Sequence, residues 1–303
     1  MQNEYSTAVK ELKTVADFLR FGLSKALAGN LWCGHGTDNV QDDIWALVLR
    51  SLKLPFDIDK SLLHTRLLLQ EKRFLAEQLK SRIINKVPVP YLINEAYFAG
   101  LDFYVDERVI IPRSPIAEAI SQHFNPWVDE NNVKEILDLC TGSACIAIAC
   151  AYAFQDANVD AIDISKEALE VATINVERHK LKDRVKLILS NLWDKVPPKK
   201  YDLIISNPPY VSKEELRTLP KEYAHEPKLA LEAKNNGLEF AAKILKQAAD
   251  FLRPNGVLVL EVGNSAEFLA QRYRDLPFVW LDFANGGEGV CLLTKKELAR
   301  IKK

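Results

Sequence analysis

The clearest indication of the fold is the stretch Leu137-Asp138-Leu139-Cys140-Thr141-Gly142-Ser143-Ala144-Cys145. It reads as a short apolar strand that ends in a turn of small residues, after which a helix begins. Small residues let a ligand approach the backbone, and a helix N-terminus favours a negatively charged group. Ligands of open α/β sheets bind at the carboxyl ends of strands, so this turn is a candidate ligand site. The dinucleotide pattern G-x-G-x-x-G is absent, and an ordinary strand-to-helix turn is the alternative interpretation.

Strands and helices alternate on either side of this turn, from residue 134 onward. The expected strands are Glu135–Leu139, Val159–Ile162, Val185–Leu189, Leu203–Ser206 and Val257–Val262, and the expected helices are Cys145–Phe154, Lys166–His179, Leu238–Leu252 and Ala266–Arg274. Such alternation predicts an α/β fold in which a doubly wound parallel sheet is covered on both faces. Near the C-terminus, an Asn-Gly pair between the β-rich runs Phe278–Phe283 and Gly289–Thr294 predicts an antiparallel hairpin.

The residues before this region read mainly as helices. Val9, Leu12, Val15, Leu19 and Leu23 recur at helical spacing, and Gly29-Asn30 follows as a stop. Further helices are expected over Asp43–Leu52, from about Lys60 to Lys86 and over Ile116–Phe124, and a β-hairpin is expected over Tyr97–Ile111. We therefore predict a small helical domain over residues 1–95, a hairpin linker over 96–112 and the α/β domain over 113–303.

Composition limits the classes of protein that need to be considered. The chain has 303 residues, 48% of them hydrophobic, and a formal net charge of -1, so a sizeable core is possible and the strongly basic balance of a dedicated DNA binder is absent. The N-terminus lacks the pattern of a signal peptide, and no apolar run is long enough to span a membrane. The five cysteines form no CxxC pair, so we expect no metal site, no disulfide framework and a cytoplasmic location.

Polar residues follow two further strands of the predicted sheet. Asp163 lies 21 residues beyond Gly142, close to the spacing at which a carboxylate accepts hydrogen bonds from ribose hydroxyls. The alternative is that Asp163 or Ser165 caps the next helix, and both roles are compatible. Asn191 follows the third strand and offers a donor and an acceptor to an adenine edge, although a plain turn residue fits the spacing equally well.

The sharpest motif is Asn207-Pro208-Pro209-Tyr210, directly after the fourth strand. The two prolines remove N–H donors and restrict the backbone, so nearby carbonyls can face a pocket. An amide nitrogen is a poor nucleophile that carries two hydrogens, and the Asn207 side-chain oxygen and the Pro208 carbonyl can accept one each. These contacts would orient the nitrogen and stabilise its positive charge during methyl transfer, while Tyr210 packs against the planar group. A proline-rich turn without chemistry is the alternative.

The motif after the fourth strand, together with the Gly142 and Asp163 sites, resembles the class I nitrogen methyltransferases, which have a Rossmann-like fold. The similarity to the protein glutamine methyltransferases covers nearly the whole chain, because Val109-Ile110-Ile111-Pro112-Arg113-Ser114-Pro115 follows a hairpin as it does in that family. Four further motifs resemble the ribosomal branch, which methylates a glutamine in the third protein of the large ribosomal subunit: Leu31 to Asn39, Glu226-Pro227, Glu261-Val262-Gly263-Asn264-Ser265 and Asn285-Gly286-Gly287-Glu288-Gly289-Val290. The sister branch, acting on release factors, typically has Pro-Arg-Pro at residues 112–114.

This resemblance implies S-adenosylmethionine as cofactor and a large-subunit ribosomal protein as partner, with no membrane and no nucleic-acid substrate. The predicted catalytic residues are Asn207, Pro208, Pro209 and Tyr210; the predicted cofactor-binding residues are Asp138, Thr141, Gly142, Ser143, Asp163, Ile164, Asn191, Leu192 and Asn207; and the predicted substrate-binding residues are Arg113, Asn207, Pro208 and Tyr210. An ion pair within the protein is the alternative role for Arg113.

Two departures from the family pattern concern the cofactor site. The family usually has glycine where Ala144 stands and aspartate where Asn191 stands. We expect a helical backbone at Ala144 to tolerate the added methyl group. The alternative functions are a release-factor glutamine methyltransferase, a nucleic-acid amine methyltransferase, which the balanced charge disfavours, and a non-catalytic binder such as a ribosome-assembly factor, which the intact Asn-Pro-Pro-Tyr motif disfavours.

Overall fold

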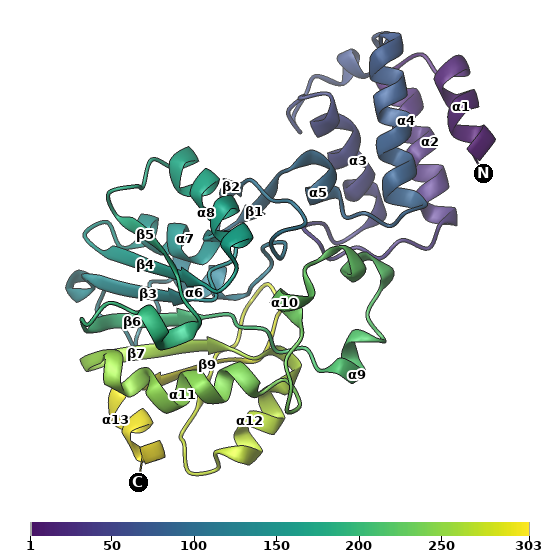
Figure 1. Ribbon diagram of the computed structural model, residues 1–303. Helices are drawn as coiled ribbons and strands as arrows, with labels where there is room; N and C mark the ends of the chain where they lie inside the picture. The colour runs from purple at the N-terminus through teal and green to yellow at the C-terminus, as the bar shows by residue number, and fades with distance from the viewer. Residues whose placement is uncertain (1, 303) are drawn as a thin grey trace. The chain divides into compact units, whose positions relative to one another are not determined.

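The computed structural model describes residues 2–302 and divides into two compact units (Figure 1). The first unit contains Met1–Ala96 together with Pro220–His225, and the second contains Tyr97–Leu219 together with Glu226–Lys303. A short segment from far along the chain therefore belongs with the N-terminal residues. The substrate-recognition role of residues 1–95 and the linker role of residues 96–112 stay predictions.

A seven-stranded mixed sheet forms the centre of the second unit, in the order β5-β4-β3-β6-β7-β9-β8. Its strands are β3 (Glu135–Leu139), β4 (Asn158–Asp163), β5 (Val185–Leu189), β6 (Tyr201–Ser206), β7 (Leu252–Glu261), β8 (Val279–Trp280) and β9 (Val290–Thr294). The first five in chain order are parallel, and β9 runs antiparallel to β7 and β8, so the predicted sheet and terminal hairpin are confirmed. The chain moves outward from β3 to β5 and then returns to the other side of β3.

Successive residues of the strands point to opposite faces of the sheet, and each face is covered by helices (Figure 1). Leu203 and Ile205 pack in one core with residues of α6 (Ile116–Ser121), α7 (Cys145–Ala153) and α8 (Lys166–Arg178). Ile204 packs in the other core with residues of α11 (Glu239–Phe251), α12 (Ala266–Arg272) and α13 (Lys295–Leu298). The near-continuous apolar strands follow from burial on both faces.

The connections contain short elements that the apolar periodicity did not predict. They are η2 (Glu130–Asn132), η3 (Leu192–Lys195), α9 (Lys213–Leu216), α10 (Lys228–Leu231), η5 (Gly263–Ser265) and η6 (Ala299–Lys302). A hairpin is confirmed at residues 96–103, where β1 (Ala96–Phe98) and β2 (Leu101–Phe103) form a two-stranded sheet around a turn with positive φ at Ala99 and Gly100. The predicted extension of the hairpin to Ile111 was wrong, because residues 104–111 form no strand. Helix α6 ends before the predicted Phe124, because the backbone turns left-handed at His123 and Phe124.

The first unit is helical, as predicted, but two of its expected helices are interrupted. Its elements are α1 (Gln2–Glu11), α2 (Val15–Ala28), α3 (Val40–Ser51), η1 (Lys60–His64), α4 (Leu69–Ile83), α5 (Val89–Ile93) and η4 (Lys221–His225). The predictions of one continuous helix from Val9 to Leu23 and of a single helix from Lys60 to Lys86 were therefore wrong. No helix among the described residues is long and apolar enough to cross a membrane.

One tertiary contact explains both interruptions. Thr14 and Arg66 form an isolated antiparallel β-bridge, and the Leu67 N–H donates to the Lys13 carbonyl over 2.8 Å. The backbone must be extended at both places to make this contact. Helix α2 then restarts through a capping box between Thr14 and Asp17, in which each side chain accepts from the other's backbone.

A buried ionic network lies in the core of the helical unit. The Arg82 side chain, 2% exposed, donates through Nε to Asp43 at 2.6 Å and through Nη1 to Glu222 at 3.1 Å. Its Nη2 also donates to the Trp32 carbonyl at 2.8 Å, and Glu222 accepts from the Trp32 N–H. Glu222 lies in the segment 220–225, so this network attaches that segment to the helices of the same unit.

We predict that Arg82→Ala lowers the free energy of unfolding of the helical unit by about 3–5 kcal/mol, because it leaves two buried carboxylates without their partner. Lys80→Ala is the matched control on the same helix. Among the described residues the Lys80 side chain makes only a 3.9 Å pair with the exposed Glu77, so its loss should change stability by less than about 1 kcal/mol. Urea denaturation followed by circular dichroism measures both. Equal stabilities for the two variants would contradict the structural role of the network.

Candidate active site

The candidate site lies where the strand order reverses, between β3 and β6. Leu139 and Ser206, the last residues of these strands, are register partners, and the Ser206 hydroxyl donates to the Leu139 carbonyl at 2.8 Å. The small-residue turn after β3 and the Asn-Pro-Pro-Tyr loop after β6 therefore begin side by side. This is the crevice in which doubly wound sheets bind their ligands.

The turn after β3 is built from left-handed backbone. Cys140, Gly142 and Ala144 have φ values of 63°, 54° and 64°, and the Thr141 N–H donates to the Ile162 carbonyl of β4 at 2.9 Å. The expectation of a helical backbone at Ala144 was wrong, because this residue is the left-handed N-cap of α7. An L-residue with a Cβ is disfavoured by about 1–2 kcal/mol there, which is the physical reason why glycine suits the position.

Asp138 lies beneath this turn as a buried carboxylate. The Thr141 hydroxyl donates to its Oδ2 at 2.5 Å, while Oδ1 makes no hydrogen bond among the described residues. Burial raises the pKa of Asp138 to about 7, against the hydrogen bond from Thr141 and with a smaller contribution from the charge of Asp163. A buried acceptor without a partner is costly, so this oxygen suits a donor supplied by a ligand.

Asp163 holds the turn from the neighbouring strand. Its Oδ2 accepts the Gly142 N–H at 2.8 Å, and its Oδ1 accepts the Ser165 N–H at 2.9 Å. The Ser165 side chain accepts from the Ala168 N–H at 3.0 Å, so Ser165 caps α8 as predicted. Each Asp163 oxygen keeps a second lone pair for another donor, and the side chain is partly exposed.

The remaining predicted cofactor residues lie around the same strand ends. Ile164 is 52% exposed although it is apolar, and Asn191 is exposed at the tip of β5. Leu192 is buried with a φ of 47°. Ser143 is buried in the turn, and its carbonyl accepts from the Asn175 side chain at 2.9 Å.

The Asn-Pro-Pro-Tyr loop is supported by a buried carboxylate that the motifs did not single out as a site residue. Pro208 and Pro209 are buried, whereas Asn207 and Tyr210 are partly exposed. The Tyr210 hydroxyl donates to Glu261 at 3.1 Å. Glu261 ends β7, and its neighbour Leu260 is the register partner of Ser206, so the carboxylate lies next to the start of the loop.

Arg113 forms an ion pair within the protein. Its two Nη atoms donate to Glu226 at 2.5 and 2.7 Å, and Glu226 also accepts the Ile111 N–H at 3.1 Å. Arg113 thus makes the ion pair within the protein that was the alternative prediction for it. Contact between Arg113 and a substrate stays a prediction. The sequence prediction did not include four supporting residues among its site residues: Ser114, Asn175, Glu226 and Glu261.

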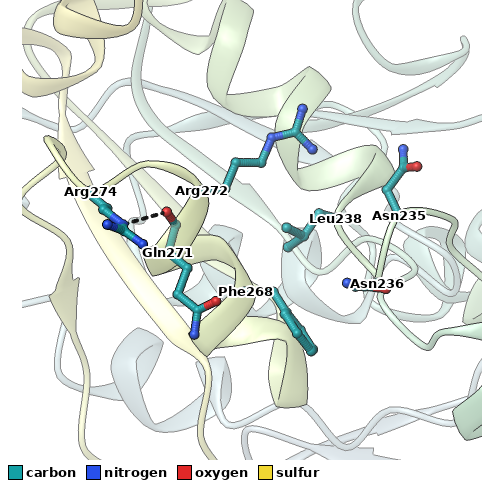
Figure 2. Close-up of a pocket in the computed structure, with 7 residues that line it drawn as sticks. All are labelled: Asn235, Asn236, Leu238, Phe268, Gln271, Arg272 and Arg274. Carbon is teal, nitrogen blue, oxygen red and sulfur yellow. Dashed lines mark hydrogen bonds between the residues drawn. The ribbon is translucent and has the colours of Figure 1, made fainter.

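A surface hollow lies outside the strand-end site (Figure 2). It is lined by Asn235, Asn236, Leu238, Phe268, Gln271, Arg272 and Arg274, none of which belongs to the predicted site. Among the described residues, no group of three or more His, Cys, Asp or Glu side chains is arranged to hold a metal ion.

The sheet order and the polar strand ends define a class I methyltransferase fold. The family model "Methyltransferase small domain" matches residues 119–226. A ribosomal protein uL3 glutamine methyltransferase from Francisella tularensis is 46% identical over 302 residues, covering 99% of this chain and 96% of the relative. The protein of the same description from Neisseria meningitidis is 44% identical over 295 residues, covering 97% of each. A solved methyltransferase from Pyrococcus furiosus has a TM-score of 0.48 at 22% identity, over 65% of this chain and 89% of that one.

The chain belongs to the family of ribosomal protein uL3 glutamine methyltransferases, and its methyl donor is S-adenosylmethionine. The residues at the strand ends fit this cofactor. The unpartnered Oδ1 of Asp138 suits an ammonium group, the open lone pairs of Asp163 suit hydroxyls, and the exposed Ile164 suits a flat apolar ring. A Cβ added at Gly142 would meet nothing closer than 3.9 Å, so space is open beside the turn.

We predict that the stability of the cofactor-free protein depends on pH through Asp138. The pKa of about 7 in the folded state exceeds the ordinary unfolded value of about 3.9, so the folded state binds the proton more tightly. This contribution to stability is present at low pH and is lost as the pH rises from about 4 to about 7.

Asp138→Asn should remove that dependence. The variant should exceed the wild type in stability at pH 8 by a few kcal/mol, because each tenfold difference in proton affinity between the folded and unfolded states corresponds to about 1.4 kcal/mol. Urea denaturation at pH 5 and pH 8 without cofactor measures the difference. Asp183→Asn, at an exposed position, is the control. Parallel pH profiles for Asp138→Asn and the wild type would refute the assignment.

Proposed function

We propose that this chain transfers a methyl group from S-adenosylmethionine to the side-chain amide nitrogen of a glutamine in ribosomal protein uL3. The observation that carries the proposal is the position of Asn207 to Tyr210 beside the β3 turn, fixed by the Leu139–Ser206 register. The full-length likeness to the uL3 glutamine methyltransferases supports the choice of substrate. A ribosomal substrate agrees with a cytoplasmic location, which is part of the proposal.

The cofactor would be held by Asp138, by the Thr141-Gly142-Ser143 turn, by Asp163-Ile164 and by Asn191-Leu192, with Asn207 between cofactor and substrate. When bound, S-adenosylmethionine supplies an electrophilic methyl group on a positively charged sulfur. The polar side chains at the strand ends fix its orientation, and the positive end of α7 faces the turn.

The catalytic problem is the weak nucleophilicity of an amide nitrogen. The Asn207 Oδ1 and the Pro208 carbonyl accept its two N–H groups, which orients the nitrogen toward the methyl carbon, while Tyr210 packs on the planar amide. These residues would hold the nitrogen so that its lone pair faces the electrophilic methyl group that the cofactor would supply. The positively charged nitrogen is stabilised by both acceptors and then loses a proton to water, so no dedicated base is required.

We predict that Asn207→Ala slows methyl transfer by about 10²–10³-fold, by analogy with the loss of one oriented polar group in a transition state. Cofactor affinity should change far less, because the acceptor acts mainly when the nitrogen becomes positive. Single-turnover kinetics at saturating cofactor and calorimetric binding measure the two effects. Asn158→Ala, at the exposed opposite end of β4, is the control and should match the wild type. Wild-type turnover by Asn207→Ala would favour the plain-turn interpretation.

The substrate is tested by offering purified uL3 and a purified peptide release factor in parallel with labelled cofactor. We predict labelling of uL3 at one glutamine, located by mass spectrometry of the digested protein. Preferential labelling of the release factor would place the chain in the sister branch. Labelling of neither protein, by an enzyme that binds the cofactor, would refute the proposed substrate class.

A further inference from the structure

Glu261 is a carboxylate with 3% exposure that lies directly behind the Asn-Pro-Pro-Tyr loop. The Tyr210 hydroxyl donates to its Oε1 at 3.1 Å, and the Ser114 hydroxyl donates to its Oε2. The donors come from two segments almost a hundred residues apart. A carboxylate can only accept, so both hydroxyl protons must point toward it.

The residues after Glu261 hold the same tyrosine at two further places. A Cβ at Gly263, where φ is 46°, would lie 2.5 Å from the Tyr210 ring, so only glycine allows this close approach. The Ser265 hydroxyl lies 3.1 Å from the Tyr210 carbonyl and 2.9 Å from the Asn236 carbonyl. One segment thus contacts Tyr210 at its hydroxyl, its ring and its backbone.

We propose that Glu261 is a positioning residue for methyl transfer: it fixes Tyr210, and through Tyr210 the Asn-Pro-Pro-Tyr loop, by accepting hydrogen bonds. The inference rests on the function proposed above, since it assigns the support of that catalytic loop. Glu261 acts through the loop and contacts no reacting atom.

The surroundings of Glu261 act on its charge in both directions. Burial raises the pKa of Glu261, whereas hydrogen bonding from Ser114 and Tyr210 and the charge of Arg113 lower it, with a smaller contribution from the Asn207 side chain. Asn207 precedes the two prolines and Tyr210 in the same loop, so fixing Tyr210 also restricts where Asn207 lies.

The Glu261→Gln variant distinguishes a positioning role of Glu261 from a role in proton transfer. Its amide oxygen accepts from a hydroxyl as the carboxylate does, and Ser114 can rotate to accept from the new amide group, but glutamine cannot act as a base. Glu261→Gln should therefore stay within about threefold of the wild-type single-turnover rate, whereas Glu261→Ala should lose about tenfold to a hundredfold, the range for a hydrogen bond to a charged group. Cofactor affinity should be unchanged in both. Glu267→Ala, an exposed carboxylate on the following helix, is the control.

A second readout needs no substrate. The protein is labelled with 3-fluorotyrosine, and the ¹⁹F resonance of Tyr210 is assigned by its loss in Tyr210→Phe. We expect this resonance to move and broaden in Glu261→Ala, and to stay near its wild-type position in Glu261→Gln and Glu267→Ala. The measurement is made on the full chain with and without S-adenosylmethionine, so it remains informative if uL3 is not the substrate.

An unchanged Tyr210 resonance in Glu261→Ala would overturn the proposal, as would a wild-type single-turnover rate in that variant. If Glu261→Ala does not fold, Glu261→Gln decides: a loss as large as that of Asn207→Ala would indicate proton transfer and overturn positioning, and near wild-type turnover would support it. Failure of the wild-type enzyme to methylate uL3 refutes the proposed function instead, and leaves the fluorine result standing.

Discussion

The pairing of β3 with β6 is the constraint on which the candidate site depends. The register sets Leu139 opposite Ser206, and the Ser206 hydroxyl bonds the last carbonyl of β3. A slip of one residue would turn Leu203 and Ile205 toward the wrong core and would move Asn207 away from the β3 turn. The two apolar cores that flank the sheet therefore also specify the geometry of the site, because they allow only one register.

Two carboxylates near the site are buried. Burying a charged group costs free energy, and the fold itself does not require charged groups at these positions. Asp138 and Glu261 both have raised pKa values because of burial, and Asp138 keeps an oxygen without a partner. An unpartnered buried oxygen such as Asp138 Oδ1 destabilises the cofactor-free chain, and a donor from a bound ligand would offset that cost. Arg82 contrasts with them, since its donors reach two carboxylates and a carbonyl within the helical unit.

The sequence predicted the features that depend on neighbouring residues. Strand β3 matched the predicted range, and Gly142, Asp163 and Asn207 all lie at strand ends as expected, because continuous apolar runs determine where buried parallel strands stop. It did not predict breaks that distant contacts impose. A single helix was expected from about Lys60 to Lys86, yet the bridge between Thr14 and Arg66 keeps the chain extended before α4 begins at Leu69.

Glu261 was missed as a site residue for the same reason, because it reads as the end of an apolar strand while its partners lie at positions 114 and 210.

The structure shows a hydrogen-bonding role for Ser114 that its sequence motif alone does not reveal. It is 8% exposed, so it offers little surface to a protein substrate. Its hydroxyl donates to Glu261 and accepts the Ile116 N–H at 3.1 Å. A proline at this position, as in the release-factor pattern, can do neither. Ser114 therefore contributes to the support of the catalytic loop a hydrogen bond that a proline at this position cannot supply.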